Sequence, residues 1–259
     1  MAEPRPLMGQ HALVTGGGSG IGFAIAKRLA DLGASVTVAA RTTDRLEAAA
    51  ATLTRCDVVQ ADVGDPAAVR RAFAALDERG HALTILINNA GVAKSAKFAE
   101  TDGALWEEML RVNLTGVYHC IQAGLPRILA AGGGRIVTIA STAGLVGYPY
   151  VSAYCAAKHG VIGLTRALAA EYASRGVTFK AVCPGYADTD MTRQTVANIV
   201  AKTGRTENEA LAALTARNPQ HRLVTADEVA AAVAWLCLPE SGAVNGQAIS
   251  VSGGEVMVG

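Results

Sequence analysis

The stretch Thr15-Gly16-Gly17-Gly18-Ser19-Gly20-Ile21-Gly22 decides the fold of this chain. It lies between an apolar run of strand length and a longer helical pattern. In that position, glycine allows the tight turn at Gly16, the approach of backbone N–H groups to a phosphate at Gly20, and close packing of helix on strand at Gly22. The N-terminus of the helix then faces the anion. The stretch therefore predicts a site for the pyrophosphate of a dinucleotide.

Outward from this stretch, short apolar runs alternate with longer helical patterns. Seven runs have the length and near-continuous apolar character of strands that are buried on both faces: His11–Thr15, Ser35–Ala40, Val58–Ala61, Leu83–Asn88, Arg135–Ala140, Thr178–Cys183 and Ala248–Val251. The helical patterns are Gly20–Leu32, Thr43–Arg55, Pro66–Arg79, Trp106–Ala131, Ser152–Arg175, Asn208–Ala216 and Ala226–Leu238. This alternation predicts an α/β fold, with a seven-stranded parallel sheet and helices on both of its faces.

The length of the chain predicts its domain organisation. Its 259 residues suit one doubly wound domain, residues 1–259, with a single core. One part breaks the strand–helix alternation, because residues 186–223 hold polar and helical pieces where a short return to the next strand is expected. We interpret this part as an insertion that covers the substrate.

The composition excludes several classes of function. The 23 basic and 22 acidic residues give a net charge of +1 without a long run of one sign, so we expect a small-molecule substrate and neither nucleic acid nor a membrane as partner. The five cysteines are widely spaced and include no CxxC pair, so we expect no disulfide framework and no metal site. The region from Met1 to Met8 lacks an apolar run, and no later segment has the length to span a bilayer, which favours a soluble, unprocessed, cytoplasmic protein.

A second set of residues indicates proton-transfer chemistry. Tyr154 and Lys158 are four residues apart in a helical pattern, so their side chains project from one face. The ammonium group of Lys158 can lower the pKa of the phenol and make Tyr154 a proton donor or acceptor near neutral pH. Ser141 follows the fifth predicted strand, and Asn88-Asn89-Ala90-Gly91 lies at the end of the fourth. Together with the glycine-rich stretch, these residues predict a nicotinamide site with proton-transfer chemistry beside it.

The end of the second predicted strand bears on the choice of dinucleotide. An acidic residue there would accept hydrogen bonds from the adenosine ribose and repel a 2′-phosphate. The chain has Ala40 instead, followed by Arg41, whose guanidinium can bind a phosphate through two hydrogen bonds and stack on adenine. Arg41 therefore favours NADP(H) as the cofactor. NAD(H) stays an alternative, because the guanidinium could stack on the adenine of either dinucleotide. Asp62 follows the third strand and is placed to accept from the adenine amino group, with the Val63 backbone beside it.

Taken together, these motifs resemble the short-chain dehydrogenase/reductase family and its Rossmann fold, from about Gly9 to the C-terminus. The resemblance implies that Asn89, Ala90 and Gly91 line the adenosine side of the cofactor. It also implies a loop on the nicotinamide side in which Thr189 binds the carboxamide or a phosphate. The complete set of predicted cofactor-binding residues is Gly16, Ser19, Gly20, Ile21, Gly22, Arg41, Asp62, Val63, Asn89, Ala90, Gly91, Tyr154, Lys158, Pro184, Gly185, Thr189 and Met191.

The same resemblance implies a catalytic set of Asn113, Ser141, Tyr154 and Lys158. In the reducing direction, Tyr154 gives a proton to the carbonyl oxygen while Ser141 orients and polarises the carbonyl, and hydride comes from the nicotinamide. Lys158 stabilises the phenolate and holds the nicotinamide ribose. Asn113, in Val112-Asn113-Leu114-Thr115-Gly116, interrupts a long helix and holds a water that reloads the proton.

The identity of the substrate is less tightly defined by the sequence. Residues 144–151 and 186–217 should line the pocket, and they predict an apolar lining with a few phenols: Leu145, Val146, Tyr148, Tyr150, Val151 and Tyr186. Local strings resemble β-ketoacyl and polyketide ketoreductases within the family. A coenzyme A thioester, a carrier-bound acyl group and a free ketone all stay open. Lys94 and Lys97 could meet a coenzyme A phosphate, or they could be solvated loop residues.

Three functions follow from these observations. The first is an NADPH-dependent reductase of a 3-oxoacyl thioester or a related hydrophobic ketone, which Arg41 and the intact catalytic set favour. The second is an NAD-dependent dehydrogenase of a 3-hydroxyacyl-CoA or a secondary alcohol. The third is a dinucleotide-binding sensor without activity, which would require loss of Tyr154 or Lys158, and both are present. By resemblance we also expect a homotetramer, with the predicted helices Trp106–Ala131 and Ser152–Arg175 at one interface.

Overall fold

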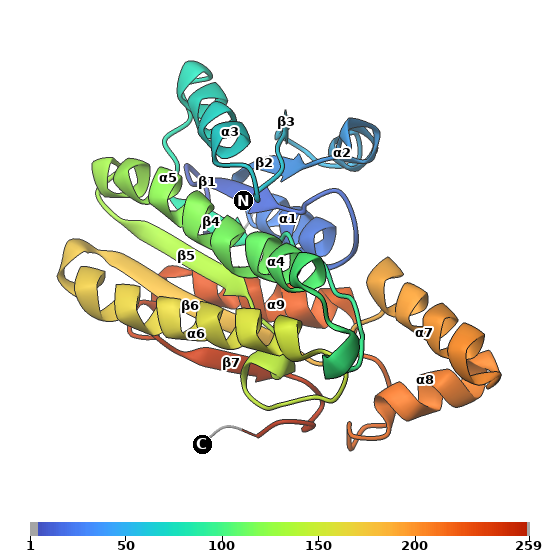
Figure 1. The fold of residues 1–259 in the computed structure, drawn as a ribbon. Helices are drawn as coiled ribbons and strands as arrows, with labels where there is room; N and C mark the ends of the chain where they lie inside the picture. Colours follow the sequence, from blue (N-terminus) through green and yellow to red (C-terminus); the bar gives the residue numbers. More distant parts are fainter. Residues whose placement is uncertain (1–4, 258–259) are drawn as a thin grey trace.

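The computed structural model describes residues 5–257 and contains one sheet of seven strands. The strands are β1 (His11–Thr15), β2 (Ser35–Ala40), β3 (Cys56–Gln60), β4 (Ile85–Asn88), β5 (Gly134–Ile139), β6 (Val177–Pro184) and β7 (Ala248–Val251). They lie in the order β3-β2-β1-β4-β5-β6-β7 across the sheet (Figure 1). All neighbouring strands are parallel, so their carboxyl ends meet at one edge. The predicted fold class is confirmed.

The strand order reverses beside β1, which pairs with β2 on one side and with β4 on the other. Leu13 of β1 is aligned with Thr37 of β2 and with Leu86 of β4. In a doubly wound sheet, a ligand binds in the crevice outside the carboxyl ends at such a switch point. The glycine-rich stretch and the Asn89–Gly91 segment both leave the sheet at this point, so the fold brings the two predicted motifs together.

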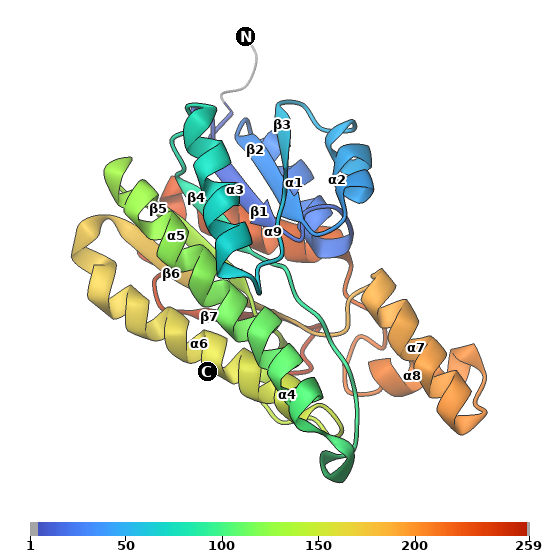
Figure 2. The same ribbon diagram turned by 45° about the horizontal axis from the view of Figure 1, so that its top comes forward.

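Helices cover both faces of the sheet and bury two apolar clusters. One face carries α3 (Pro66–Glu78), α5 (Gly116–Ala130) and α6 (Ser152–Tyr172), whose core includes Phe73 and Phe179. The other carries α1 (Gly20–Asp31), α2 (Thr43–Ala50) and α9 (Ala226–Cys237), whose core includes Ile25 and Val233. Figures 1 and 2 show the two layers. Within the described part of the chain, no helix is both long enough and apolar enough to cross a membrane.

The predicted element boundaries are close to the observed ones. The bounds of β1, β2 and β7 are as predicted, and those of the other strands differ by one or two residues. The helix predicted over Thr43–Arg55 is wrong at its end, because α2 stops at Ala50 and the chain turns to reach β3. Arg55 has a φ of 58°, a left-handed conformation that cannot continue a helix.

The helix predicted over Trp106–Ala131 is wrong as one continuous α-helix, whereas the interruption at Asn113 that the family resemblance implied is confirmed. The structure has α4 (Gly103–Leu110), a π-helical turn from Arg111 to Thr115, and then α5. The Asn113 side chain explains the interruption, because its Nδ2 donates to the carbonyl oxygen of Met109, four residues earlier, and to that of Val92. A side chain that binds into the helical ladder in this way favours a π turn. The turn holds Asn113 fully buried at the carboxyl edge of the sheet.

Residues 186–223 contain two helices, of which only the second was predicted. These are α7 (Asp190–Thr203) and α8 (Glu207–Thr215), and they project from one end of the sheet (Figures 1 and 2). Thr189 caps α7 by accepting from the backbone N–H of Thr192, and Thr206 forms a capping box with Glu209 at the start of α8. The polar sequence of α7 buries only Thr192 and Val196, so it lacks the apolar periodicity that would predict a helix.

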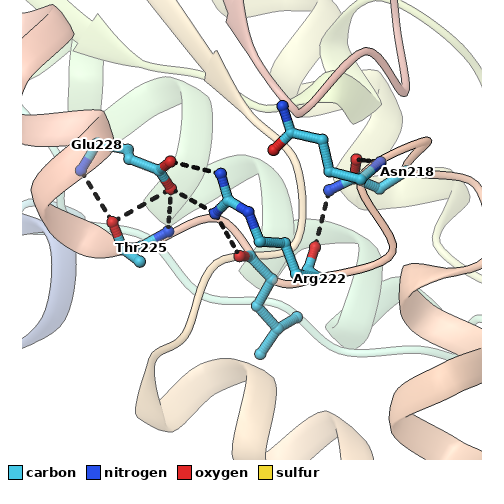
Figure 3. Close-up of polar contacts among 6 residues, drawn as sticks. Asn218, Arg222, Thr225 and Glu228 are labelled. Atoms are coloured by element: carbon cyan, nitrogen blue, oxygen red, sulfur yellow. Dashed lines mark hydrogen bonds and ion pairs between the residues drawn. The ribbon is translucent and has the colours of Figure 1, made fainter.

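The return from α8 to α9 is fixed by a polar network (Figure 3). The Asn218 side chain donates to the carbonyl oxygen of Arg222, and the Arg222 guanidinium forms an ion pair with Glu228. Glu228 also completes a capping box with Thr225 at the start of α9. The Arg222 guanidinium and the Thr225 N–H hold the pKa of Glu228 down at about 2. The network therefore ties the projecting helices to the main sheet layer.

A histidine pair lies at the opposite edge of the sheet from the switch-point crevice. His11, at the start of β1, is buried, and its Nε2 atom lies 3.0 Å from the hydroxyl oxygen of Thr37. Its ring stacks on His81 with centroids 4.1 Å apart, and His81 lies 2.7 Å from an Asp57 carboxylate oxygen. Burial, with a contribution from His81, lowers the pKa of His11 from 6.5 to about 4. His11 is therefore neutral in the folded protein.

This shift predicts that acid destabilises the fold through His11. Between the folded pKa of about 4 and the unfolded value of 6.5, only the unfolded chain binds the proton, so stability falls as the pH falls through that window. From about pH 7 to about pH 5, the wild type should lose about 2 kcal/mol more unfolding free energy than His11→Asn. Urea denaturation at both pH values measures the difference. His221→Asn, at an exposed histidine, should behave as wild type, and equal losses for His11→Asn and wild type would contradict the argument.

Candidate active site

The glycine-rich turn is packed so tightly that side chains are excluded from it. Gly16 has a φ of 66°, which favours glycine. A methyl group on Gly22 would lie 2.2 Å from the Gly16 carbonyl oxygen and 2.4 Å from Asn89 Nδ2. The turn thus leaves its backbone open beside the N-terminus of α1, where N–H groups lack helical partners. This cradle fits the pyrophosphate of a dinucleotide.

Thr15 joins the glycine turn to the end of β4. Its buried hydroxyl accepts from the backbone N–H groups of Asn89 and Ala90, at 3.0 and 3.1 Å, and lies 3.3 Å from the carbonyl oxygen of Ile87. The Asn89 side chain binds the turn in addition, because its Nδ2 donates to the carbonyl oxygens of Thr15 and Gly16. The amide of Asn89 therefore stabilises the turn, and its place on the adenosine side of a cofactor stays a prediction.

The start of α1 meets the loop that follows β6. Ser19 is the N-cap residue of α1, but its hydroxyl makes no capping hydrogen bond, so it can bind a phosphate. Gly20 has a φ of 52°, and a methyl group on it would lie 3.3 Å from Thr189 Cγ2. Ile21 is partly buried in the first turn of α1. The predicted nicotinamide-side loop thus lies directly over the glycine turn.

The rest of that loop extends from the end of β6 into α7. Pro184 ends β6, and the N–H of Gly185 donates to the carbonyl oxygen of Val251 in β7. Met191 lies in the first turn of α7 with 43% of its surface exposed. The β6–β7 pairing therefore fixes the start of the loop, while Met191 stands free to contact a bound molecule.

The end of the crevice where we predict adenosine to bind carries two arginines and one carboxylate. Arg41 is exposed just after β2, and its charge reaches Asp62. Asp62 accepts from the Gly64 N–H at 2.9 Å and from Arg111 at 3.2 Å. Burial raises the pKa of this carboxyl, but these two partners outweigh burial and hold the pKa below its usual value. Val63 is buried beside it. Arg111, from the π turn, was not predicted, and it occupies one of the oxygens that we assigned to adenine.

Asn113, Gly91 and Lys158 converge beneath the nicotinamide side of the crevice. A methyl group on Gly91 would lie 2.9 Å from Asn113 Oδ1 and 3.9 Å from Lys158 Nζ. Asn113 Oδ1 accepts from the Val92 N–H at 3.1 Å, which fixes the amide orientation. Lys158 is buried, and its Nζ donates to the carbonyl oxygen of Ile139 at 2.8 Å. Burial lowers the pKa of Lys158 to about 8.

Tyr154 and Ser141 face each other on the substrate side of Lys158. Lys158 Nζ lies 5.6 Å from the centre of the Tyr154 ring. Ser141, just after β5, accepts from the Ala143 N–H at 3.1 Å, and its hydroxyl lies next to the Tyr154 phenol. Burial raises the pKa of Tyr154 to about 12, against the opposing effect of Ser141. The predicted lowering of this pKa by Lys158 is wrong for the protein alone, because the ammonium binds the Ile139 carbonyl and burial dominates.

Charged side chains lie beside Tyr148, one of the residues predicted to line the substrate pocket. The Tyr148 hydroxyl donates to Glu255 at 2.6 Å, and the Arg217 guanidinium lies 4.8 Å from the centre of the Tyr148 ring. Tyr150, a predicted lining residue, is 62% exposed. Two charged side chains therefore lie against one of the predicted phenols, and one of them, Glu255, comes from the C-terminal segment after β7, outside the segments from which we predicted the pocket.

Several other predicted features can be placed. Lys94 and Lys97 form ion pairs with Glu108 and Glu100, which favours solvated loop residues over coenzyme A contacts. All five cysteines are free. Among residues 5–257, no three His, Cys, Asp or Glu side chains are grouped so that they could hold a metal ion.

Sequence reasoning missed Thr15, Arg111 and Glu255. The position of Thr15, immediately before the first glycine, was the one available signal. Arg111 is placed by the π turn, and Glu255 is placed by the position of β7 beside β6. Local sequence patterns show neither the turn nor the strand order.

The chain is similar to known proteins over most of its length. The family model of short chain dehydrogenases matches residues 10–200. The chain is 40% identical to "Granaticin polyketide synthase putative ketoacyl reductase 1" of Streptomyces violaceoruber, over 98% of this chain and 95% of that protein. It is 34% identical to D-beta-hydroxybutyrate dehydrogenase of Rhizobium meliloti, over 95% of this chain and 98% of that one. The solved structure of a variant of actinorhodin polyketide ketoreductase with NADPH superposes with a TM-score of 0.92 at 38% identity, covering 95% of this chain and 97% of that chain.

The fold, the cradle and these matches define the class of protein: the chain belongs to the short-chain dehydrogenase family. It is an NAD(P)-dependent oxidoreductase that acts on CH–OH groups and the corresponding carbonyl compounds. The resemblance stated from the motifs is thereby confirmed.

Proposed function

We propose that this protein is an NADPH-dependent reductase of a 3-oxoacyl thioester or a related ketone. The convergence of Ser141, Tyr154, Lys158 and Asn113 beside the glycine cradle carries the proposal. The ketoacyl reductase relatives and the neighbour solved with NADPH support it. When bound, the nicotinamide supplies a hydride to the carbonyl carbon.

In this mechanism, Tyr154 is the proton donor. Its pKa of about 12 keeps the phenol protonated at neutral pH, which suits the reducing direction. The negative charge that grows on the carbonyl oxygen meets two preorganised O–H donors, Tyr154 and Ser141. The backbone N–H of Ala143 holds the Ser141 oxygen in place, so the Ser141 hydrogen is free to point toward the substrate.

Lys158 and Asn113 serve the phenolate that remains after proton transfer. The Lys158 ammonium, held by the Ile139 carbonyl, lies near the Tyr154 ring and stabilises the phenolate charge. Its remaining donors are available to the nicotinamide ribose. Asn113 and Lys158 both lie close to Gly91. We propose that the π turn holds a water beside Asn113 and that Tyr154 regains its proton through this water.

We propose that Arg41 selects NADPH by binding its 2′-phosphate. Removal of a charge-assisted hydrogen bond costs about ten- to hundredfold in affinity. Arg41→Ala should therefore raise KM for NADPH by that factor and change KM for NADH by less than about threefold. Arg28→Ala, at an exposed arginine in the last turn of α1, is the matched control. Equal effects of Arg41→Ala on the two cofactors would contradict the assignment.

The proposed function is tested by nicotinamide oxidation with acetoacetyl-CoA, using NADPH and NADH in parallel. Turnover that prefers NADPH supports the reductase. Turnover with NADH alone would favour the NAD-dependent dehydrogenase of a 3-hydroxyacyl-CoA or a secondary alcohol. Absence of turnover with either cofactor would overturn the thioester assignment and turn the search to free ketones.

We further propose that the protein is a cytoplasmic homotetramer built from one domain per chain, with residues 186–223 covering the substrate. Part of the range 1–259 predicted for that domain lies outside the described residues. Trp106 on α4 and Tyr118 on α5 are large and exposed, which supports an interface along these helices. Sedimentation equilibrium should give four times the chain mass of 26.5 kDa, and a monomer mass would overturn the tetramer.

A further inference from the structure

We infer that Glu255, Tyr148 and Arg217 form a polar subsite that selects acyl chains carrying a hydroxyl group close to the reacting ketone. This inference rests on the proposed function and adds the part of the substrate that lies beyond the carbonyl. We call these three residues the polar subsite.

Two chain segments that are distant in sequence bring the charges together. A methyl group on Gly253 would lie 2.2 Å from Asn218 Oδ1, and one on Gly254 would lie 3.4 Å from Pro219 Cγ. Residues 218–219 and 253–254 are therefore packed directly against each other. Arg217 and Glu255 flank these two pairs, and both contact the same side chain, that of Tyr148. The network around Asn218 (Figure 3) holds this arrangement.

Tyr148 joins the two charged side chains. Its hydroxyl donates to Glu255 Oε1 at 2.6 Å, and its ring lies 4.8 Å from the Arg217 guanidinium. The Tyr148 hydroxyl thus orients the carboxylate, and the ring face binds the cation. Arg217 is exposed, and no acidic residue among those described forms an ion pair with it. Its N–H donors are open to a bound molecule.

The polar subsite borders the reaction centre. A methyl group on Gly185 would lie 2.9 Å from Glu255 Oε2, so this oxygen faces the loop that follows β6. Strand pairing places this loop beside the reaction centre, because β6, which ends just before Gly185, lies next to β5, which ends two residues before Ser141. The pKa of Tyr186, raised first by burial and then by Glu255, agrees with this placement. We therefore expect a chain that extends from a carbonyl at Tyr154 to run toward Glu255.

The chemistry of the three groups defines what they bind. A carboxylate oxygen only accepts hydrogen bonds, and a guanidinium only donates them. A substrate hydroxyl can do both, since it can donate to Glu255 Oε2 and accept from Arg217. An unsubstituted methylene would displace water from both charges and replace none of the lost hydrogen bonds, and a site built for polar groups discriminates strongly against such a substrate.

Two N-acetylcysteamine thioesters test the inference with NADPH as cofactor. One carries an unsubstituted 3-oxoacyl chain, and the other carries the same chain with a hydroxyl two carbons beyond the ketone. The wild type should reduce the hydroxylated thioester with a kcat/KM at least about tenfold higher. Glu255→Leu should bring the ratio close to one, mainly through a higher KM for the hydroxylated substrate. Glu255→Gln, which keeps the size of the side chain, should give an intermediate ratio.

The matched control is Glu78→Leu at the exposed end of α3, which should keep the wild-type ratio. A ratio near one in the wild type, or an unchanged ratio in both Glu255 variants, would overturn the polar subsite while leaving the reductase assignment intact. Reduction of neither thioester would contradict the proposed function instead. In that case, thermal stabilisation by the two thioesters decides: greater stabilisation by the hydroxylated one, lost in Glu255→Gln, supports the subsite, and equal stabilisation overturns it.

Discussion

Tyr154→Phe should lower kcat for carbonyl reduction by about a thousandfold. The variant keeps the ring packed beside Lys158 and Ser141 but removes the proton that the growing oxyanion receives. Because the hydroxyl is the only group removed, the Kd for NADPH should change by less than about threefold. Steady-state kinetics and a fluorescence titration of NADPH measure the two quantities.

Tyr118→Phe supplies the matched control, since Tyr118 is 46% exposed on α5. It should retain the wild-type kcat. If Tyr154→Phe kept more than about a tenth of the wild-type activity, a different group would have to donate the proton, and Ser141 would be the nearest candidate.

Gly22→Ala should abolish dinucleotide binding and destabilise the fold. Its new methyl group would lie 2.2 Å from the Gly16 carbonyl oxygen, a backbone atom that cannot move without opening the turn. Overpacking of this kind costs on the order of 3 kcal/mol of unfolding free energy. The displaced turn no longer matches a pyrophosphate, so the Kd for NADPH should rise at least about a hundredfold.

A glycine with free space around it gives the comparison for this experiment. Nothing lies within 4 Å of a methyl group placed on Gly163 in α6. Gly163→Ala should raise the unfolding free energy by up to about 1 kcal/mol, as alanine does in a helix interior. Normal NADPH binding by Gly22→Ala would contradict the assignment of the cradle.

The parallel sheet and the switch-point crevice were predictable because their signals are local. Buried parallel strands give continuous apolar runs, as in Ile85, Leu86 and Ile87 of β4, and a glycine turn after the first run has few alternatives. The shared helix face of Tyr154 and Lys158 was equally predictable, since helical spacing alone brings the two side chains to one face.

The remaining features depend on contacts that only the folded chain makes. The π turn arises from the Asn113 amide, which binds Met109 and Val92, and hydropathy does not show such a contact. α7 has a polar sequence with little buried surface. Glu255 enters the pocket because β7 lies next to β6, which no local pattern reveals. The pKa of Tyr154 is raised mainly by burial, which helical spacing does not show.

The central claim is hydride transfer to a carbonyl carbon in the crevice beside Tyr154. The most direct test uses NADPH carrying deuterium at both positions of C4 with acetoacetyl-CoA, followed by mass spectrometry of the product. The account predicts one deuterium on the carbinol carbon of the 3-hydroxyacyl product, formed by the wild type and lost with Tyr154→Phe. Oxidation of NADPH without deuterium at that carbon, or no oxidation at all, would contradict it.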